Sequence, residues 1–183
     1  LGFAVNKNKW LISFDNFYKK VDGITSRSQG FQNQYEFVKT TGDFTVFGTE
    51  VLIQKQFEYL TTWVSYTFQE NEYEFESLSP SKFPNNFEIK HDLKAALIAD
   101  YKNIKLALGS HWFTGKPSTL PSSNTAVYTT PDTPTVAYQS PNSDNLEAYF
   151  QLNLSGSYAF NTGKKSKLSL GFSIQNLLNN ETV

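Results

Sequence analysis

The sequence predicts an all-β protein, a partial antiparallel up-and-down transmembrane β-barrel in which about eight strands belong to a larger barrel. Apolar and polar residues alternate with a period of two through most of the 183 residues, as in strands with one apolar face. No run approaches the roughly eighteen apolar residues of a transmembrane helix. The expected connections are alternately short and long, as in outer-membrane barrels, whose short turns face the periplasm and whose long loops face outward.

The clearest element is a hairpin of two long strands within residues 145–182. In each strand the apolar side chains share one parity: Phe150, Leu152, Leu154, Tyr158 and Phe160 before the turn, and Leu168, Leu170, Phe172 and Ile174 after it. The other parity is mostly Ser, Gly, Ala, Asn and Gln, which suit a crowded polar lumen. The aromatics near the turn, Tyr158 and Phe160, fit an interfacial girdle.

The earlier strands show the same alternation in chain order. We expect a strand end at 1–5 and strands at 10–21, 44–57, 60–68 with an extension through 76, 88–101 and 104–112. Short turns are expected near Asn6, Glu58, Lys102 and Asn161, and long loops over 22–43, 77–86 and 115–146. One continuous outer surface should hold Leu93, Leu97, Leu106, Leu108, Leu152, Leu154, Leu168, Leu170 and Phe172.

The composition narrows the possible functions. There is no Cys, so these residues contain no disulfide and no thiolate chemistry. The chain starts at Leu1, contains no Met and shows no secretory signal pattern, so we interpret it as a piece of a longer protein. A net charge of −1 with scattered basic residues gives no electrostatic reason to expect nucleic acid. Aromatics at 16% favour interfacial girdles.

No constellation of residues indicates catalysis. There is no nucleophile elbow, no Gly-rich phosphate loop and no carboxylate pair in a catalytic context, so we expect neither an enzyme nor a cofactor. His91 and His111, with Asp92 as a third group, would hold a metal only if they converged. We expect no metal and a structural role for both histidines on the polar inner face.

The strand that begins near residue 60 continues into an acidic extension. Four carboxylates share the parity of its lipid-facing residues: Glu70, Glu72, Glu74 and Glu76. Each would cost a few kcal/mol in lipid, so this part must lie beyond the hydrocarbon. It is either a rim contact for a divalent cation or ligand, or a solvated strand extension, which we favour. Tyr73 and Phe75, on the opposite parity, are candidate ligand contacts that face the vestibule.

Several short sequence motifs, in order, resemble the C-terminal part of the barrel of a TonB-dependent outer-membrane receptor of the Bacteroidetes kind. FGTE at 47–50 and LTTWVSYTF at 60–68 resemble the family's G-x-E strand and its aromatic-rich partner. Pro84 through His91 to Tyr101, and then WFTGKP at 112–117, resemble its P…H strand and Y-x-T-G-x-P rim. IQNLLN at 174–179 resembles its N-L-F-N. YFQLN at 149–153 stands where Y-x-R-L-D is usual, so Gln151 and Asn153 replace both charged residues.

The resemblance implies a barrel of about 22 strands plugged by an N-terminal domain. Residues 1–183 would then be its C-terminal segment, without the plug and the final strand. It further implies a place in the bacterial outer membrane, with membrane lipid as one partner and TonB as another, contacted through a missing N-terminal segment. The implied function is a receptor that binds a nutrient (a glycan, peptide or metal chelate) with extracellular loops and imports it with energy from the inner membrane.

Within the longest loop, Tyr128 and Tyr138 are candidate ligand contacts, because a phenol ring can stack on or hydrogen-bond a sugar or peptide. One alternative of a different class stays open: a soluble all-β binding module, such as a carbohydrate-binding β-sandwich. That module would display aromatics on one sheet face and pack its leucines into a dry core. Here the aromatics gather at strand ends.

Overall fold

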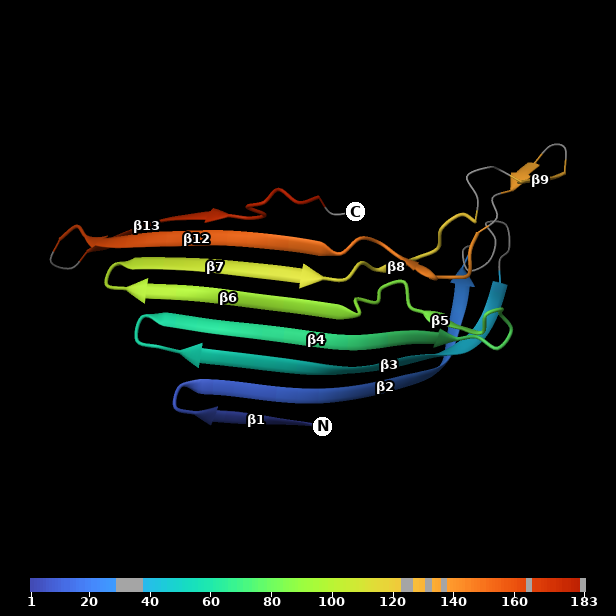
Figure 1. Cartoon of the computed structure of the whole chain (residues 1–183), viewed down its shortest axis with the longest axis horizontal. Coiled ribbons are helices and arrows are strands. Elements are labelled where there is room, and N and C mark those ends of the chain that lie inside the picture. The colour runs from blue at the N-terminus through green and yellow to red at the C-terminus, as the bar shows by residue number, and fades with distance from the viewer. Residues whose placement is uncertain (29–37, 123–126, 131–132, 136–137, 164–165, 182–183) are drawn as a thin grey trace.

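Eight long strands form one antiparallel sheet in the order β1-β2-β3-β4-β6-β7-β12-β13 (Figure 1). The structure, a computed structural model, describes residues 1–28, 38–122, 127–130, 133–135, 138–163 and 166–181. The eight strands are β1 Gly2–Lys7, β2 Trp10–Ser28, β3 Val38–Gln56, β4 Leu60–Glu74, β6 His91–Tyr101, β7 Ile104–Phe113, β12 Tyr149–Asn161 and β13 Lys167–Ile174. The predicted all-β class and up-and-down order are confirmed.

Five short strands lie within the long connections. They are β5 Lys82–Pro84, which pairs with β4, β8 Pro117–Ser118 with β11 Asp144–Asn145, and β9 Val127–Thr130 with β10 Thr133–Thr135. In the part of the chain that the structure describes, no helix is long and apolar enough to cross a membrane.

The short turns lie at one end of the sheet and the long connections at the other (Figure 1). β1 and β2 are joined by Asn8 and Lys9, whose φ angles are 52° and 64°. Positive φ at both central residues matches the right-handed twist of the paired strands. Lys102, with φ of 56°, begins the equally short turn between β6 and β7. The predicted alternation of short and long connections is confirmed.

The loop expected over residues 22–43 is largely strand. β2 continues to Ser28 and β3 starts at Val38, with a register shift between Val21 and Ile24. Gly23, with φ of 72°, provides the left-handed residue that such a bulge uses. Beyond it, both strands turn across the direction of the other long strands (Figure 1). The backbone pairs here without apolar alternation in the sequence.

The apolar residues of neighbouring strands lie opposite one another, and directly opposed residues project from the same face of a sheet. Leu97 lies opposite Leu108. Leu108 also lies opposite Leu154, which in turn lies opposite Ile174. The prediction of one continuous outer surface is therefore confirmed for all nine residues: Leu93, Leu97, Leu106, Leu108, Leu152, Leu154, Leu168, Leu170 and Phe172.

No second sheet covers this surface in the described residues, and its side chains are exposed or half-buried. Among the described residues, the buried hydrophobic ones are Phe75, Leu78 and Phe83. They lie away from this surface, at the end of the sheet that carries the long connections. The dry leucine core that a β-sandwich needs is thus not formed by these residues. Within the same ranges β1 pairs only with β2, and β13 only with β12, so the sheet is open at both edges.

Candidate functional site

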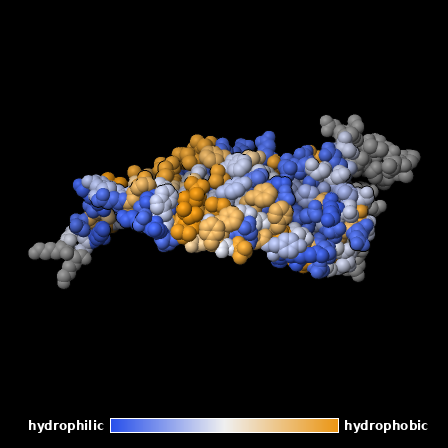
Figure 2. Space-filling view, turned by 60° about the horizontal axis from the view of Figure 1, so that its bottom comes forward, coloured by the Kyte–Doolittle hydropathy of each residue, from blue (hydrophilic) through white to orange (hydrophobic). Residues whose placement is uncertain are grey.

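The apolar face is one side of the sheet, and its centre is aliphatic. It is formed by Val5, Ile12, Ile53, Val64, Leu93, Leu97, Leu106, Leu108, Leu152, Leu154, Leu170 and Ile174. Figure 2 shows hydrophobic residues gathered over the middle of the molecule, with hydrophilic residues toward both ends. Contiguous exposed apolar surfaces of this extent mark contacts with protein or membrane.

The length of the apolar face along the strands fits a bilayer. On β4 it extends from Leu60 to Phe68, nine residues, and on β6 from Leu93 to Tyr101, again nine. A transmembrane strand needs about 9–11 residues when it is tilted. The side chains that continue the same parity of β4 beyond Phe68 are Glu70, Glu72 and Glu74. The apolar stretch of β4 therefore ends at Phe68, where the carboxylates begin.

An aromatic belt borders the apolar face at the short-turn end. Tyr59 and Tyr101 meet edge to face, with ring centroids 5.0 Å apart. The Lys55 ammonium lies 4.7 Å from the centre of the Trp10 ring and donates a hydrogen bond to the carbonyl of Asn8 at 3.0 Å. Lys55 has apolar-face parity, so its aliphatic stem lies over the apolar face while its charge reaches the turn, as snorkelling lysines do at membrane interfaces.

A second aromatic belt lies toward the long connections. Phe3 and Phe14 stack with ring centroids 5.7 Å apart, and Phe47 meets Phe68 at 6.1 Å. Tyr66 belongs to the same belt because it shares the face and lies two residues from Phe68. Two belts that flank an aliphatic band are the pattern of outer-membrane barrels.

The two histidines project from opposite faces. His91 lies opposite Phe68 on the apolar face, and its Nδ1 is 2.8 Å from the hydroxyl of Tyr66. His111 lies opposite Lys94 on the polar face, and its Nε2 is 3.1 Å from both carboxylate oxygens of Asp92. The expected inner-face position is therefore wrong for His91, because His91 is two residues from Leu93 and so shares its face. Among the described residues no three His, Asp or Glu side chains converge as metal ligands would.

Neutral side chains make a hydrogen-bond network around Gln151 and Asn153. Gln151 donates from Nε2 to Oδ1 of Asn153 at 2.8 Å. The same oxygen accepts the backbone N–H of Asn176 at 2.9 Å, and Asn180 donates to the carbonyl of Phe150 at 2.7 Å. These bonds fold the Asn-rich segment after β13 back onto β12. The Asn residues here therefore satisfy backbone groups.

The rim core consists of Phe75, Leu78 and Phe83, with Ile24 and Tyr73 packed against it. Phe75 stacks on Phe83 with centroids 6.0 Å apart, and burial raises the pKa of the Tyr73 phenol. Tyr73 and Phe75 share the parity opposite to the glutamates, as predicted, and their ring centroids are 5.8 Å apart. The ring of Phe75 is only 1% exposed, so it packs the rim and offers almost no surface to a ligand in this structure.

The other two candidate ligand contacts lie in the connection from β7 to β12. Tyr138 forms an isolated bridge with Pro121, and the N–H of Gln139 donates a hydrogen bond to the carbonyl of Leu120 at 2.9 Å. These two contacts bring the two arms of the connection together, and we call this place its neck. Tyr128 belongs to β9, and its side chain lies outside the described residues. Their role toward a ligand stays a prediction.

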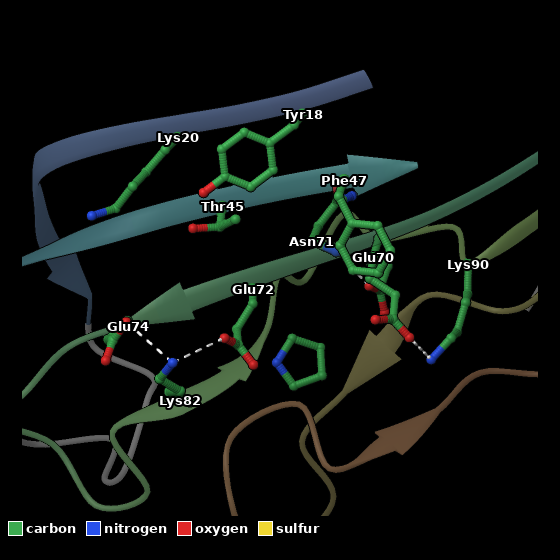
Figure 3. A pocket seen from close by; sticks show the side chains of 12 residues that line it. Tyr18, Lys20, Thr45, Phe47, Glu70, Asn71, Glu72, Glu74, Lys82 and Lys90 are labelled. Atoms are coloured by element: carbon green, nitrogen blue, oxygen red, sulfur yellow. Dashed lines mark hydrogen bonds and ion pairs between the residues drawn. The ribbon is translucent and has the colours of Figure 1, made fainter. Parts of the chain in front are cut away.

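The rim groove is a hollow of about 660 Å³ on the apolar-face side of the rim, just beyond the second aromatic belt (Figure 3). It is lined by Tyr18, Lys20, Thr45, Phe47, Glu70, Asn71, Glu72, Glu74, Lys82, Pro84, Glu88 and Lys90. Strands β2, β3 and β4 provide its floor, because Phe47 lies opposite Glu70 and Thr45 opposite Glu72. β5 adds Lys82, which lies opposite Glu74.

Every lysine of the rim groove is paired with a carboxylate. Lys90 contacts Glu70 at 2.5 Å, and Lys82 contacts Glu74 at 3.3 Å and Glu72 at 3.7 Å. Lys20 contacts Asp22 and Asp43 at 2.9 and 3.2 Å. Hydrogen bonds to these carboxylates raise the pKa of Lys82 and Lys90. The acidic extension is therefore part of an ion-paired rim, and its lysines come from positions that the sequence pattern did not single out.

Three buried polar residues hold the rim segments together, and sequence reasoning missed them. Glu88 accepts the N–H of Asn71 at 2.7 Å, and burial raises the pKa of its carboxyl. Asn85 accepts the N–H of Phe87 at 2.6 Å. Asn142 donates to the carbonyl of Pro84 at 2.7 Å, which ties the connection after β7 to the one after β4. Single polar residues in loops gave no periodic signal that could have identified them.

The chain matches no protein-family model, and neither curated proteins nor solved structures give a match.

Proposed function

We propose that this chain is a membrane-embedded arc of an outer-membrane β-barrel receptor of the TonB-dependent kind, which binds a nutrient at its long-loop end and imports it. The observation that carries the proposal is the apolar face: aliphatic side chains lie between two aromatic belts, and with the belts included the face is about nine residues long on β4 and on β6. Within the described residues no layer of protein packs on this face. Contact with lipid would remove its apolar side chains from water.

The direction of insertion follows from the connections. The short turns would face the periplasm and the long ones the outside. The charged rim groove, the rim core and the connection after β7 all lie at the long-loop end. A nutrient would meet these elements first, and transport would need the plug and the energy-coupling segment implied by the family resemblance.

Localisation is tested by fractionating cells that produce the full-length protein. We expect it in the outer-membrane fraction. In gel electrophoresis with detergent, the heated and therefore unfolded protein should migrate more slowly than the unheated protein, as folded barrels show. Recovery of folded protein in the soluble fraction without detergent would contradict the proposal.

Transport is tested separately in the same cells with labelled glycans, peptides and metal chelates. We expect accumulation of one class, and its loss when the inner-membrane proton gradient is dissipated, with surface binding retained. Accumulation that persists without the gradient would rule out energy-coupled import while leaving the membrane position standing.

A further inference from the structure

We propose that the short-turn end of β1, β2 and β3 binds the phosphate of an anionic membrane phospholipid, such as phosphatidylglycerol. The site consists of Lys7, Lys9 and Lys55 around Trp10, and we call it the lysine cluster. The inference rests on the proposed membrane position of the apolar face. It adds a specific lipid-binding site at the end of the sheet that lies opposite the rim groove.

The register places two of these lysines on either side of one tryptophan. Lys7 of β1 lies opposite Trp10 of β2, and Trp10 lies opposite Lys55 of β3. The three side chains therefore form one row across neighbouring strands and project from the apolar face. Lys9 belongs to the turn between β1 and β2, and its carbonyl accepts the N–H of Gln56 at 3.0 Å. This bond ties the turn to β3, so the three lysines belong to one corner of the sheet.

No carboxylate pairs with the lysine cluster in the part of the chain that the structure describes. The lysines that form ion pairs there are Lys20, Lys82, Lys90, Lys94 and Lys105. The Lys55 ammonium lies over the rings of Trp10 and Phe57 and donates one hydrogen bond to the carbonyl of Asn8. An ammonium has three N–H donors, so Lys55 keeps two for a phosphate. The lysine cluster therefore presents positive charge without an anionic partner.

The depth of the lysine cluster is that of lipid headgroups. Trp10 belongs to the aromatic belt at the short-turn end, and such belts lie at headgroup level. Two residues toward the middle of the sheet, about 7 Å along the strand, the next row is aliphatic. There Val5 lies opposite Ile12, and Ile12 lies opposite Ile53. These three side chains are 50%, 37% and 41% exposed, so they offer an apolar surface to acyl chains whose phosphate meets the lysines.

The charges of the lysine cluster favour an anionic headgroup over a zwitterionic one. Lysines at a membrane surface attract anionic lipids, and each lysine adds to the attraction. Phosphatidylethanolamine and phosphatidylcholine carry an ammonium beside the phosphate. In the lysine cluster that ammonium would meet further ammonium groups and no carboxylate. Phosphatidylglycerol carries only the negative charge, so it should bind in preference to both.

The test is native mass spectrometry of the full-length protein in detergent with equal amounts of phosphatidylglycerol, phosphatidylethanolamine and phosphatidylcholine of the same chain length. We expect preferential retention of phosphatidylglycerol, and about a tenfold loss of that preference in the Lys7→Gln, Lys55→Gln double variant. The Lys7→Arg, Lys55→Arg variant keeps both charges and should keep the preference. The matched control is Lys105→Gln with Lys167→Gln, which removes the same charge from the same end of the sheet but at positions of polar-face parity. It should leave the preference unchanged.

Equal retention of the three lipids would overturn the inference, and so would an equal loss of preference in the glutamine variant and its control. An unchanged preference in a glutamine variant that still migrates as a folded barrel would do the same. Displacement of the lipid by free glycerol phosphate would also overturn it, because the site would then recognise a soluble anion. These results leave the membrane proposal intact as long as the protein requires detergent. A protein that is folded without detergent and retains no lipid would contradict both proposals.

Discussion

Leu97 of β6 lies directly opposite Leu108 of β7, and both side chains project from the apolar face. Their chain neighbours Ala96 and Gly109 form the next opposed pair and project from the polar face. A shift of one residue in register would set Leu97 opposite Ala107 or Gly109 and so move one strand's apolar side chains to the other face. The membrane assignment of the whole sheet therefore depends on a difference between adjacent residues, and that difference can be measured.

Arginine substitution at these neighbours should separate the two faces. Leu97 is the middle residue of the apolar stretch of β6 from Leu93 to Tyr101, so Leu97→Arg should destabilise the bilayer-inserted full-length protein by about 2–4 kcal/mol. Ala96→Arg is the matched control, because a Cβ at the opposed Gly109 would meet no atom within 4 Å, which shows open space on that side. Unfolding by denaturant in vesicles measures both. Equal losses would argue against a lipid-facing Leu97.

The rim core should stabilise the long-loop end. Phe83 is 3% exposed, so Phe83→Ala should cost about 3–5 kcal/mol of local stability. The loss should appear as faster hydrogen exchange at the Phe75 amide, which donates to the carbonyl of Ser81 at 2.8 Å. Phe87→Ala, at a side chain that is 70% exposed, is the control and should leave that exchange unchanged. If both variants exchange alike, Phe83 does not support the rim.

The turn at residues 85–90 should lose stability as the pH rises. Burial raises the pKa of the Glu88 carboxyl above its ordinary value of 4.5, against the opposing effects of the Asn71 amide and Lys90. The folded rim therefore binds this proton more tightly than the unfolded chain. Its stabilising contribution is complete below pH 4.5 and is lost as the pH rises through the raised folded value.

Hydrogen exchange of the same turn at several pH values, corrected for intrinsic rates, measures this dependence. Glu88→Gln should flatten the profile, because its amide oxygen can still accept the Asn71 N–H without titrating. Glu76→Gln, at an exposed residue of the same extension, should retain the wild-type slope. A wild-type slope in Glu88→Gln would assign the titration to another group.

The connection after β7 should contribute to ligand binding. Replacing residues 122–137 with two glycines removes Tyr128 but keeps the neck formed by Pro121 and Tyr138 and the Asn142 bond to Pro84. We expect weaker nutrient binding to cells that display the variant at normal surface levels. Unchanged affinity would exclude the removed segment and direct attention to the other long connections.

Much of the fold could be predicted because a sheet with one apolar face records its period in the sequence. The pairing of Leu97 with Leu108 and the two-residue turn at Lys102 follow from alternation and its interruption. The extension of β2 and β3 through 22–28 and 38–43 could not be predicted, because strands outside the apolar region need no alternation. Gly23 indicated a loop, whereas it lies at a bulge.

The rim was predicted only in part. The parity of Glu70, Glu72 and Glu74 was correct. Their partners Lys82 and Lys90 come from a separate segment, and which residues meet there depends on how β5 returns along β4. Phe75 has the parity of a vestibule residue, but the fold brings Phe83 and Leu78 onto it. Such contacts between short irregular segments leave no periodic signal.

The most direct test of the membrane-facing surface is fluorescence quenching by lipids brominated on their acyl chains. These residues contain no Cys, so an environment-sensitive fluorophore can be attached at Leu97→Cys, Leu108→Cys, Ala96→Cys or Gly109→Cys in the full-length protein with any other cysteines removed. We predict strong quenching at positions 97 and 108 and little at 96 and 109. Equal quenching at all four positions, or the reverse pattern, would contradict the assignment of the apolar face to lipid.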